Sequence, residues 1–234
     1  MQKVENSRQE FVSNVSHELK TPIAIIKGQL EGMIYQVGEY KDRDTYLRRC
    51  LKTTNDMEAL VKEILSAARM GGSDFHLERT DLDISQMLRK VCQQFRGRIE
   101  DKQMELRMDI QPEYHYQGDR RLMEKVFTNV IGNAVAYSPV GAVITVTQKD
   151  EVFSVENTGV HIAEDDLERI FTPFYRVDKS RNRNSGGSGL GLSMVYGFVR
   201  QSGGRVALES APGQGTTVRL HLPRSTLPVV PEDE

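Results

Sequence analysis

Apolar residues in the first part of the chain recur every three or four positions, in two separate stretches. The first stretch extends from Phe11 to Val37 and is closed by Gly38. The second extends from Leu47 to Ala68, after a short polar segment. Steps of three and four place such residues on one face of an α-helix. The pattern predicts two long helices joined by a tight turn, which is an antiparallel helical hairpin.

Further apolar residues lie outside these two stripes. They include Ile23 and Ile25 in the first predicted helix, and Leu51, Leu60 and Leu65 in the second. A lone hairpin has too little core to bury them, whereas two copies packed as a four-helix bundle would cover them. We therefore predict a homodimer.

His17 lies on the polar face of the first predicted helix. At about 100° per residue from Val15, Leu19 falls at about 40° and His17 at about 200°. Glu18 is adjacent to the histidine, and Thr21 lies one turn further along the same side. A surface histidine without a role is the ordinary interpretation of such a position, so the rest of the chain decides whether it has one.

After two glycines and a serine, the pattern changes to alternating strands and helices. Helical spacing is found at 84–102, 120–137, 165–171 and 191–202, and strand-like segments at 76–83, 104–110, 143–148, 152–156, 205–210 and 217–222. This alternation predicts an α+β domain built in layers. We divide the chain into the hairpin (1–70), a linker (71–75), the α+β domain (76–224) and a flexible tail (225–234).

Asn129 and Asn133 are four residues apart in the predicted helix 120–137, so both amides project from one face. A buried amide on a helix is costly unless it is satisfied, so this pair indicates a ligand or an ion. Neutral carbonyl oxygens suit Mg²⁺, which keeps several waters and is otherwise bound by phosphates.

A glycine-rich run, SGGSGLGLSM (185–194), leads directly into an amphipathic helix. Free backbone amides at such a helix start favour an anion. The run is neither a Walker A loop, because no Gly-Lys-Ser/Thr follows, nor a dinucleotide fingerprint, because no strand opens a βαβ unit there. On its own it also resembles any flexible loop.

The composition narrows the class of protein. The net charge of -2 gives no argument for nucleic-acid binding. Cys50 and Cys92 fit small core residues in a reducing compartment. No apolar run has the roughly 18–20 residues that span a bilayer, and the N-terminus is not a signal peptide. We expect a cytoplasmic chain, and its polar start would suit the cytoplasmic portion of a longer membrane sensor.

Six segments, in their order along the chain, resemble the sequence boxes of sensor histidine kinases of two-component signalling. They are FVSNVSHELKTP, NVIGNAVAYS, ENTGVHI, FTPFYRVD, GGSGLGL and GQGTT. The resemblance covers almost the whole chain. It implies a dimerising phospho-acceptor hairpin followed by a two-layer α/β sandwich of the Bergerat ATP-binding type. The implied activity is an ATP-dependent protein-histidine kinase that acts on a response regulator aspartate and also as a phosphatase.

The resemblance also implies roles for individual residues. His17 would accept the γ-phosphoryl group, with Glu18 as the base that removes its proton. Thr21 would position a water in dephosphorylation, and Arg176 would meet the γ-phosphate. Asn133 resembles the Mg²⁺ ligand. The other nucleotide-binding positions would be Asn129, Tyr137, Asn157, Gly159, Ile162, Gly187, Gly189, Leu190, Gly191 and Thr216. Ser185 to Gly191 would be the glycine-rich end of a mobile lid that reaches back to about Asp178 and carries Arg181 and Arg183.

The chain departs from the family pattern at three positions. Asn157 stands where an aspartate is usual, His161 where a glycine is usual, and Ala136 where a lysine is common. An asparagine oxygen still accepts a hydrogen bond but carries no charge, so we expect adenine recognition with weaker ATP affinity. More narrowly, the same runs are similar to those of vancomycin-resistance sensor kinases.

Two other functions fit parts of the sequence. One is a degenerate kinase that acts as a partner-binding or phosphatase module, motivated by the three departures. The other is a chaperone-like or topoisomerase-like Bergerat ATPase without a phosphohistidine. The His17 segment and its hairpin argue against the second.

Overall fold

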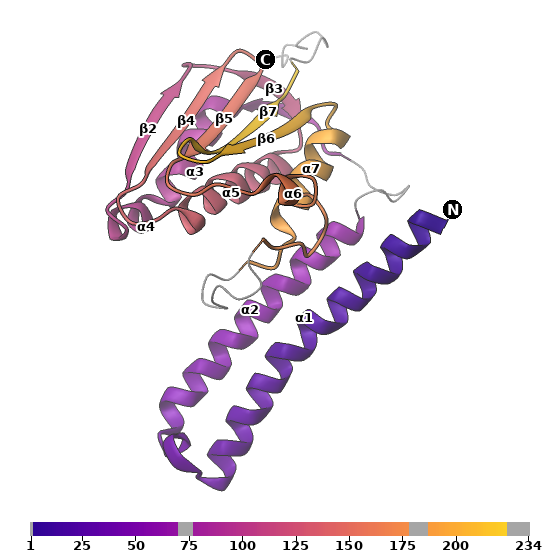
Figure 1. Ribbon diagram of the computed structural model, residues 1–234, viewed down its shortest axis with the longest axis vertical. Helices are drawn as coiled ribbons and strands as arrows, with labels where there is room; N and C mark the ends of the chain where they lie inside the picture. The colour runs from indigo at the N-terminus through magenta and orange to yellow at the C-terminus, as the bar shows by residue number, and fades with distance from the viewer. Residues whose placement is uncertain (1, 70–76, 178–186, 224–234) are drawn as a thin grey trace, which may run out of the picture.

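The computed structural model describes residues 2–69, 77–177 and 187–223. The chain begins with two long helices that form a hairpin, as predicted (Figure 1). These are helix α1 (Gln2–Tyr35) and helix α2 (Arg43–Arg69), with a 3-10 helix η1 (Gly38–Lys41) in the turn between them. The predicted linker (71–75), most of the predicted lid (178–186) and the predicted tail (225–234) lie outside the described residues.

The fully buried contact between α1 and α2 is near the turn. Met33, Tyr46 and Cys50 are 5–8 % exposed there. Tyr40 of η1 adds a ring whose centroid is 4.4 Å from that of Tyr46. Met33 and Cys50 belong to the two apolar stripes that the sequence predicts at 11–37 and 47–68, and both are buried as expected. Leu47, however, is 51 % exposed, because α2 turns Tyr46 rather than Leu47 toward α1.

Five strands form one mixed sheet in the second domain, in the order β2-β4-β5-β7-β6. Strand β2 pairs with β4 in parallel, and the other neighbours are antiparallel. A separate ladder joins β1 to β3. The bounds are β1 (Thr80–Asp83), β2 (Glu105–Ile110), β3 (His115–Gly118), β4 (Val143–Lys149), β5 (Val152–Asn157), β6 (Arg205–Ala211) and β7 (Gly215–His221). The six predicted strands are confirmed, and β3 is additional.

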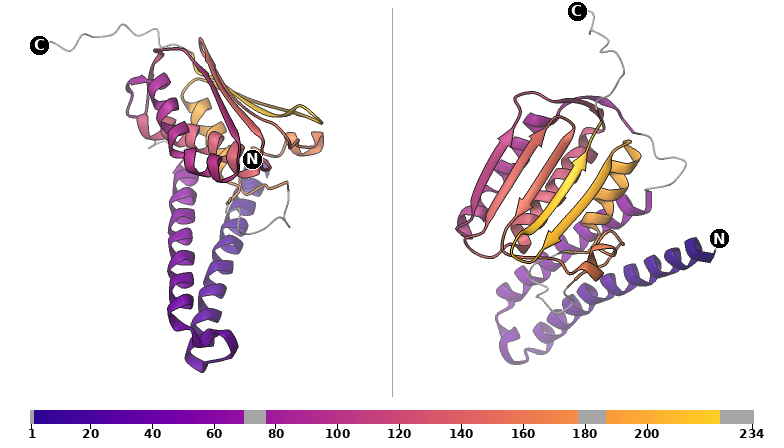
Figure 2. Two further views of the ribbon diagram at one scale, coloured as in Figure 1. Left: turned by 90° about the vertical axis from the view of Figure 1, so that its left-hand side faces the viewer. Right: turned by 45° about the horizontal axis from the view of Figure 1, so that its top comes forward.

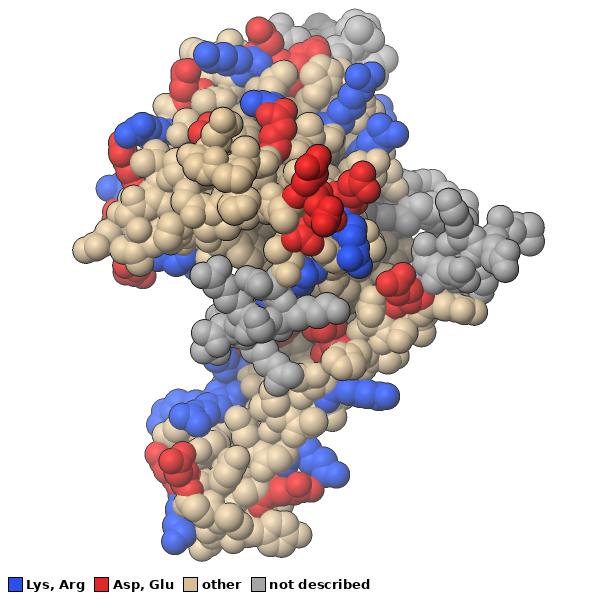
Figure 3. Space-filling view, in the orientation of Figure 1, with Lys and Arg blue, Asp and Glu red and all other residues tan. Residues whose placement is uncertain are grey.

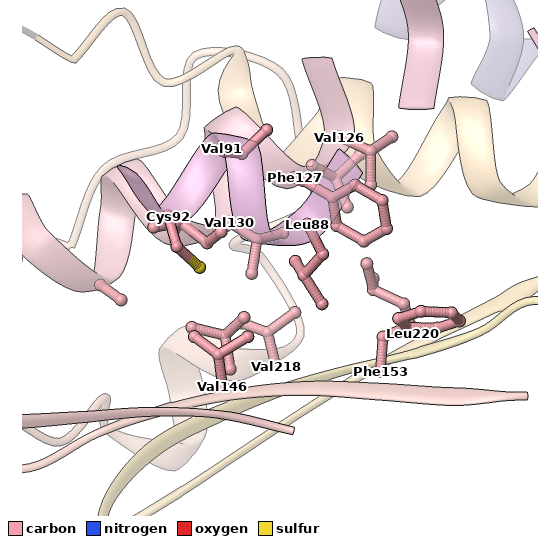
Figure 4. Packing of buried hydrophobic residues seen from close by; sticks show 14 of the residues in the cluster. Leu88, Val91, Cys92, Val126, Phe127, Val130, Val146, Phe153, Val218 and Leu220 are labelled. Carbon is pink, nitrogen blue, oxygen red and sulfur yellow. The ribbon is translucent and has the colours of Figure 1, made fainter. Parts of the chain in front are cut away.

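Three helices cover one face of this sheet and leave the other face open (Figure 2). They are α3 (Ile84–Gln94), α5 (Arg120–Tyr137) and α7 (Gly191–Gln201). Apolar side chains of the helices meet those of the strands in a single core, where Phe127 of α5 lies near Phe153 of β5, with ring centroids 5.7 Å apart (Figure 4). The predicted two-layer domain is confirmed.

Two predicted helices differ in extent. The segment 84–102 forms two helices, α3 and α4 (Arg96–Asp101), rather than one. The break is at Phe95, whose backbone (φ -92°, ψ -2°) ends α3 while its ring packs toward Gly132 of α5. Apolar spacing continues across the break, so periodicity does not reveal it. The helix expected at 165–171 is the shorter α6 (Glu164–Leu167).

The surface carries charges of both signs. On the face drawn in Figure 3, basic and acidic side chains are interspersed, with an acidic group over α6. Within the described ranges, no helix is both long enough and apolar enough to cross a membrane.

Candidate functional site

Helix α1 presents His17 to solvent. The imidazole is 81 % exposed, and its Nδ1 is 4.0 Å from Oε1 of Glu18. The hydroxyl of Thr21 donates to the carbonyl oxygen of His17 at 3.4 Å, which keeps it one turn along the same helix. The three residues predicted to act together therefore lie together. An exposed ring nitrogen with a carboxylate beside it suits a nucleophile that must lose a proton.

The side chain of Asn129 is held by its own helix, α5. Nδ2 of Asn129 donates to the carbonyl oxygen of Lys125 at 2.9 Å, so its Oδ1 is turned the other way. That oxygen lies against Gly191, where an added Cβ would come within 2.8 Å of it. Asn133 follows one turn later and is half-buried. Two amides one helical turn apart could offer oxygens to a cation whose other ligands are phosphate and water.

The glycine-rich segment lies close to two other parts of the domain, namely Tyr137 of α5 and Phe174 in the loop after α6. A Cβ on Gly187 would lie 3.3 Å from the hydroxyl of Tyr137. Gly189 has φ +74°, and a Cβ there would come within 2.7 Å of the backbone of Phe174. The N–H of Phe174 donates to the carbonyl oxygen of Gly189 at 3.0 Å, and Leu190 is fully buried. Helix α7 begins directly afterwards, so its first amides are available to an anion.

Asn157 ends strand β5 and is largely buried. The residue is 7 % exposed, and the described part of the chain gives its side chain no hydrogen-bond partner. Thr216 is its register partner on β7. The neighbouring Gly215 has φ +86°, and a Cβ there would lie 2.1 Å from the carbonyl oxygen of Asn157. A buried amide with both donor and acceptor capacity suits the polar edge of a purine.

The loop after β5 is held from two sides. Gly159, at φ +91°, packs against Pro139, which a Cβ would approach within 2.7 Å. The hydroxyl of Ser210 accepts from the N–H of Ile162 at 2.8 Å and lies 2.7 Å from Oγ1 of Thr216. Ser210 was not predicted, because a serine in an ordinary strand gives no sequence signal.

Arg176 lies two residues beyond Phe174 and is half-buried. No hydrogen bond or ion pair of its guanidinium occurs within the described residues. Its neighbour Tyr175 donates its hydroxyl to Asp166, and this hydrogen bond raises the pKa of Tyr175. The guanidinium of Arg169 lies 4.4 Å from the centroid of the Tyr175 ring. The segment that carries Arg176 is thus anchored by Tyr175.

Lys102 fixes the end of α5 and was also not predicted. Its Nζ donates to the carbonyl oxygens of Val135, Ala136 and Ser138 at 2.8, 3.0 and 3.1 Å. These carbonyls flank Tyr137, so the ammonium group holds the backbone that carries this side chain. All three donors of the ammonium group are used in this way, so Lys102 does not replace the lysine that is missing at Ala136.

The structure does not bring His17 to the nucleotide-site residues. The ring of Phe11 on α1 packs against that of Phe174, with centroids 5.4 Å apart. Six residues later, His17 is about 9 Å further along the helix and about 120° around it. Within the described ranges, no hydrogen bond or ion pair joins His17, Glu18 or Thr21 to the second domain.

Two family descriptions match the chain. Residues 7–73 match "His Kinase A (phospho-acceptor) domain", and residues 118–226 match "Histidine kinase-, DNA gyrase B-, and HSP90-like ATPase". Together they describe an acceptor hairpin followed by an ATPase domain. The chain belongs to the sensor histidine kinase family.

Individual relatives agree with this assignment. Sensor-like histidine kinase SenX3 of Mycobacterium tuberculosis is 30% identical over 225 residues, which is 94% of this chain and 55% of the relative. Sensor protein VanSB of Enterococcus faecalis is 34% identical over 224 residues, which is 94% of this chain and 50% of the relative. The chain thus spans about half the length of these curated relatives.

Among solved structures, histidine kinase ThkA in complex with the response regulator protein TrrA has the same fold. Its TM-score is 0.75 at 23% identity, covering 96% of this chain and 64% of that one.

Proposed function

We propose that this chain is the catalytic core of an ATP-dependent protein-histidine kinase that phosphorylates His17. The observation that carries the proposal is the presence, in one chain, of an exposed imidazole beside a carboxylate and a separate site of free amides and glycine backbone. Phosphoryl transfer needs mainly positioning and charge neutralisation. The separate site would bind and neutralise the phosphates, and the hairpin would present the accepting imidazole.

In this proposal the imidazole nitrogen of His17 attacks the γ-phosphorus, and the bond to the bridging oxygen of ADP breaks. Glu18 takes the imidazole proton. Asn133 would hold Mg²⁺ through its amide oxygen, and the cation would neutralise phosphate charge. Arg176 would add positive charge at the γ-phosphate. Because His17 lies about 9 Å beyond the contact at Phe11, transfer within one chain requires the nucleotide domain to move along the hairpin.

Asn157 is proposed to recognise adenine. Its buried amide supports this role, because an amide can both accept from and donate to a purine edge. The family's usual aspartate would add charge to the same hydrogen bond. Asn157→Asp should therefore bind ATP several-fold more tightly. Equal or weaker ATP binding in this variant would reject the role of Asn157. A wild type that binds ATP but takes no label from it would instead favour the degenerate-kinase alternative.

A homodimer is proposed from the apolar surface of the hairpin. Large side chains on both helices are more than half exposed in the single chain, namely Ile23, Ile34, Leu47, Leu51 and Leu65. An apolar surface of this extent on a helical pair indicates a partner, and a second copy would complete a four-helix bundle. Size-exclusion chromatography with light scattering should give twice the mass of the chain at micromolar concentration, and a clean monomer would contradict the proposal.

A response regulator is the proposed acceptor of the phosphoryl group, and the chain is also proposed to dephosphorylate it. The complex of ThkA with TrrA supports the choice of partner class. Below His17, α1 exposes charged residues that could orient a docked protein, including Lys20 and the Lys27–Glu31 pair with its charged atoms 3.7 Å apart. The narrower likeness to vancomycin-resistance sensors stays a prediction, because SenX3 is about as similar to this chain as VanSB is. The cytoplasmic location also stays a prediction.

The test of the site is labelling with γ-labelled ATP and Mg²⁺. Asn133→Ala should remove a cation ligand and lower the rate of labelling at least tenfold, while exposed Asn55→Ala on α2 should label like the wild type. Undiminished labelling of the Asn133 variant would reject its role.

A further inference from the structure

Glu63 of α2 makes a direct contact with the glycine-rich segment of the second domain. Its Oε2 accepts a hydrogen bond from the hydroxyl of Ser188 at 2.6 Å. The same hydroxyl accepts from the N–H of Leu190 at 3.2 Å. The hydroxyl of Ser188 thus links the Glu63 carboxylate to the backbone that precedes α7. A hydrogen bond to an ionised acceptor at this distance is a strong one.

The carboxylate also faces α5. Lys125 is half-buried, and burial lowers the pKa of its ammonium group while the nearby Glu63 acts in the opposite direction. The carbonyl oxygen of Lys125 is the one that holds the side chain of Asn129. Glu63 therefore stands between the two elements that would take the phosphates of a nucleotide.

The contact around Glu63 is only partly packed. Phe11, Leu60, Ile64 and Ala67 of the hairpin are half-buried against the core of the second domain. A groove of about 370 Å³ remains between the two parts, lined by Phe11, Ala67, Ala68, Phe171, Pro173, Ser193 and Gly197. An interface with such a groove is less well packed than a protein core and can separate at modest cost.

We propose that Glu63 is a specificity-determining residue that places a negative charge beside the phosphate side of the nucleotide site. The inference rests on the proposed ATP site. While α2 contacts the glycine-rich segment, the Glu63 carboxylate accepts the hydrogen bond of Ser188. It then repels an incoming phosphate, because both groups are negatively charged. Nucleotides with more phosphate charge are opposed more strongly. Binding of ATP then favours release of α2 from the glycine-rich segment, a movement that transfer to His17 within one chain requires.

Glu63→Gln tests this proposal, because glutamine has nearly the size of glutamate and keeps one acceptor oxygen but carries no charge. Adenosine, ADP and ATP, whose phosphate charge increases in that order, are titrated at fixed Mg²⁺ into the whole chain by calorimetry. A like charge several ångströms away predicts about tenfold tighter binding of ATP, a smaller gain for ADP and none for adenosine. The gain for ATP should shrink at high salt.

Glu58→Gln is the matched control, since Glu58 is on the same helix and its contact is with Lys62 at 2.6 Å. It should bind all three ligands like the wild type. Glu63→Lys, with reversed charge, should increase the gain for ATP further and provides a second variant if the first folds poorly. Equal ATP affinity in the wild type and both Glu63 variants would overturn this inference but not the proposed function. A gain in adenosine affinity as large as the gain in ATP affinity would do the same. If no protein binds any nucleotide, the proposed function falls as well.

Discussion

Removing the Lys102 ammonium group should loosen the end of α5 and with it the nucleotide site. Lys102→Met keeps most of the aliphatic stem but deletes three hydrogen bonds of 2.8 to 3.1 Å to backbone carbonyls. Hydrogen bonds from a charged donor contribute about 1.5–3 kcal/mol each. Because Lys102 is half-buried, water can replace part of this loss. We expect about 2–3 kcal/mol of destabilisation in total.

Urea unfolding of the whole chain measures this loss, and thermal unfolding should show a decrease of about 5–10 °C. Lys149→Met is the control, because Lys149 is 74% exposed and 4.0 Å from Asp109, a surface pair worth less than about 1 kcal/mol. Lys102→Arg should recover part of the stability. ATP affinity should fall for Lys102→Met, because Tyr137 lies between the released carbonyls. Equal urea midpoints for the two methionine variants would refute the reasoning.

Two further variants and one labelling experiment have defined outcomes. Thr21→Ala should leave labelling of His17 intact and slow dephosphorylation of the regulator; an unchanged dephosphorylation rate would reject the role of Thr21. Gly215→Ala should lower the free energy of unfolding by about 2 kcal/mol or more, measured in urea, because its Cβ would lie 2.1 Å from a carbonyl oxygen at φ +86°. Burial raises the pKa of the Cys92 thiol to about 11, so iodoacetamide at pH 8 should modify Cys92 only after unfolding; rapid reaction of the folded protein would contradict its burial.

Short-range signals account for what the sequence predicted well. Steps of three and four specify α1, α2 and α5, because the buried face of a helix repeats along the chain. The glycine-rich run before α7 was recognisable because close backbone approach excludes a side chain, as at Gly189. The six segments in their order were more specific than any one of them.

Contacts between distant segments account for what the sequence did not show. Lys102 and Ser138 are 36 positions apart, and Glu63 and Ser188 are 125 positions apart. No local pattern links such pairs, because the fold alone brings them together. The break at Phe95 was hidden for another reason, since its apolar side chain fits the spacing of one uninterrupted helix.

The measurement that tests the central claim most directly is the site of phosphoryl transfer. The chain and its His17→Gln variant are incubated with γ-labelled ATP and Mg²⁺, and the label is then exposed to acid and to alkali. The wild type should carry a label that is lost in acid and kept in alkali, as expected for a phosphorylated imidazole, and the variant should carry none while binding ATP equally well. A label that persists in the His17→Gln variant, or a wild type that binds ATP and takes no label, would contradict the account.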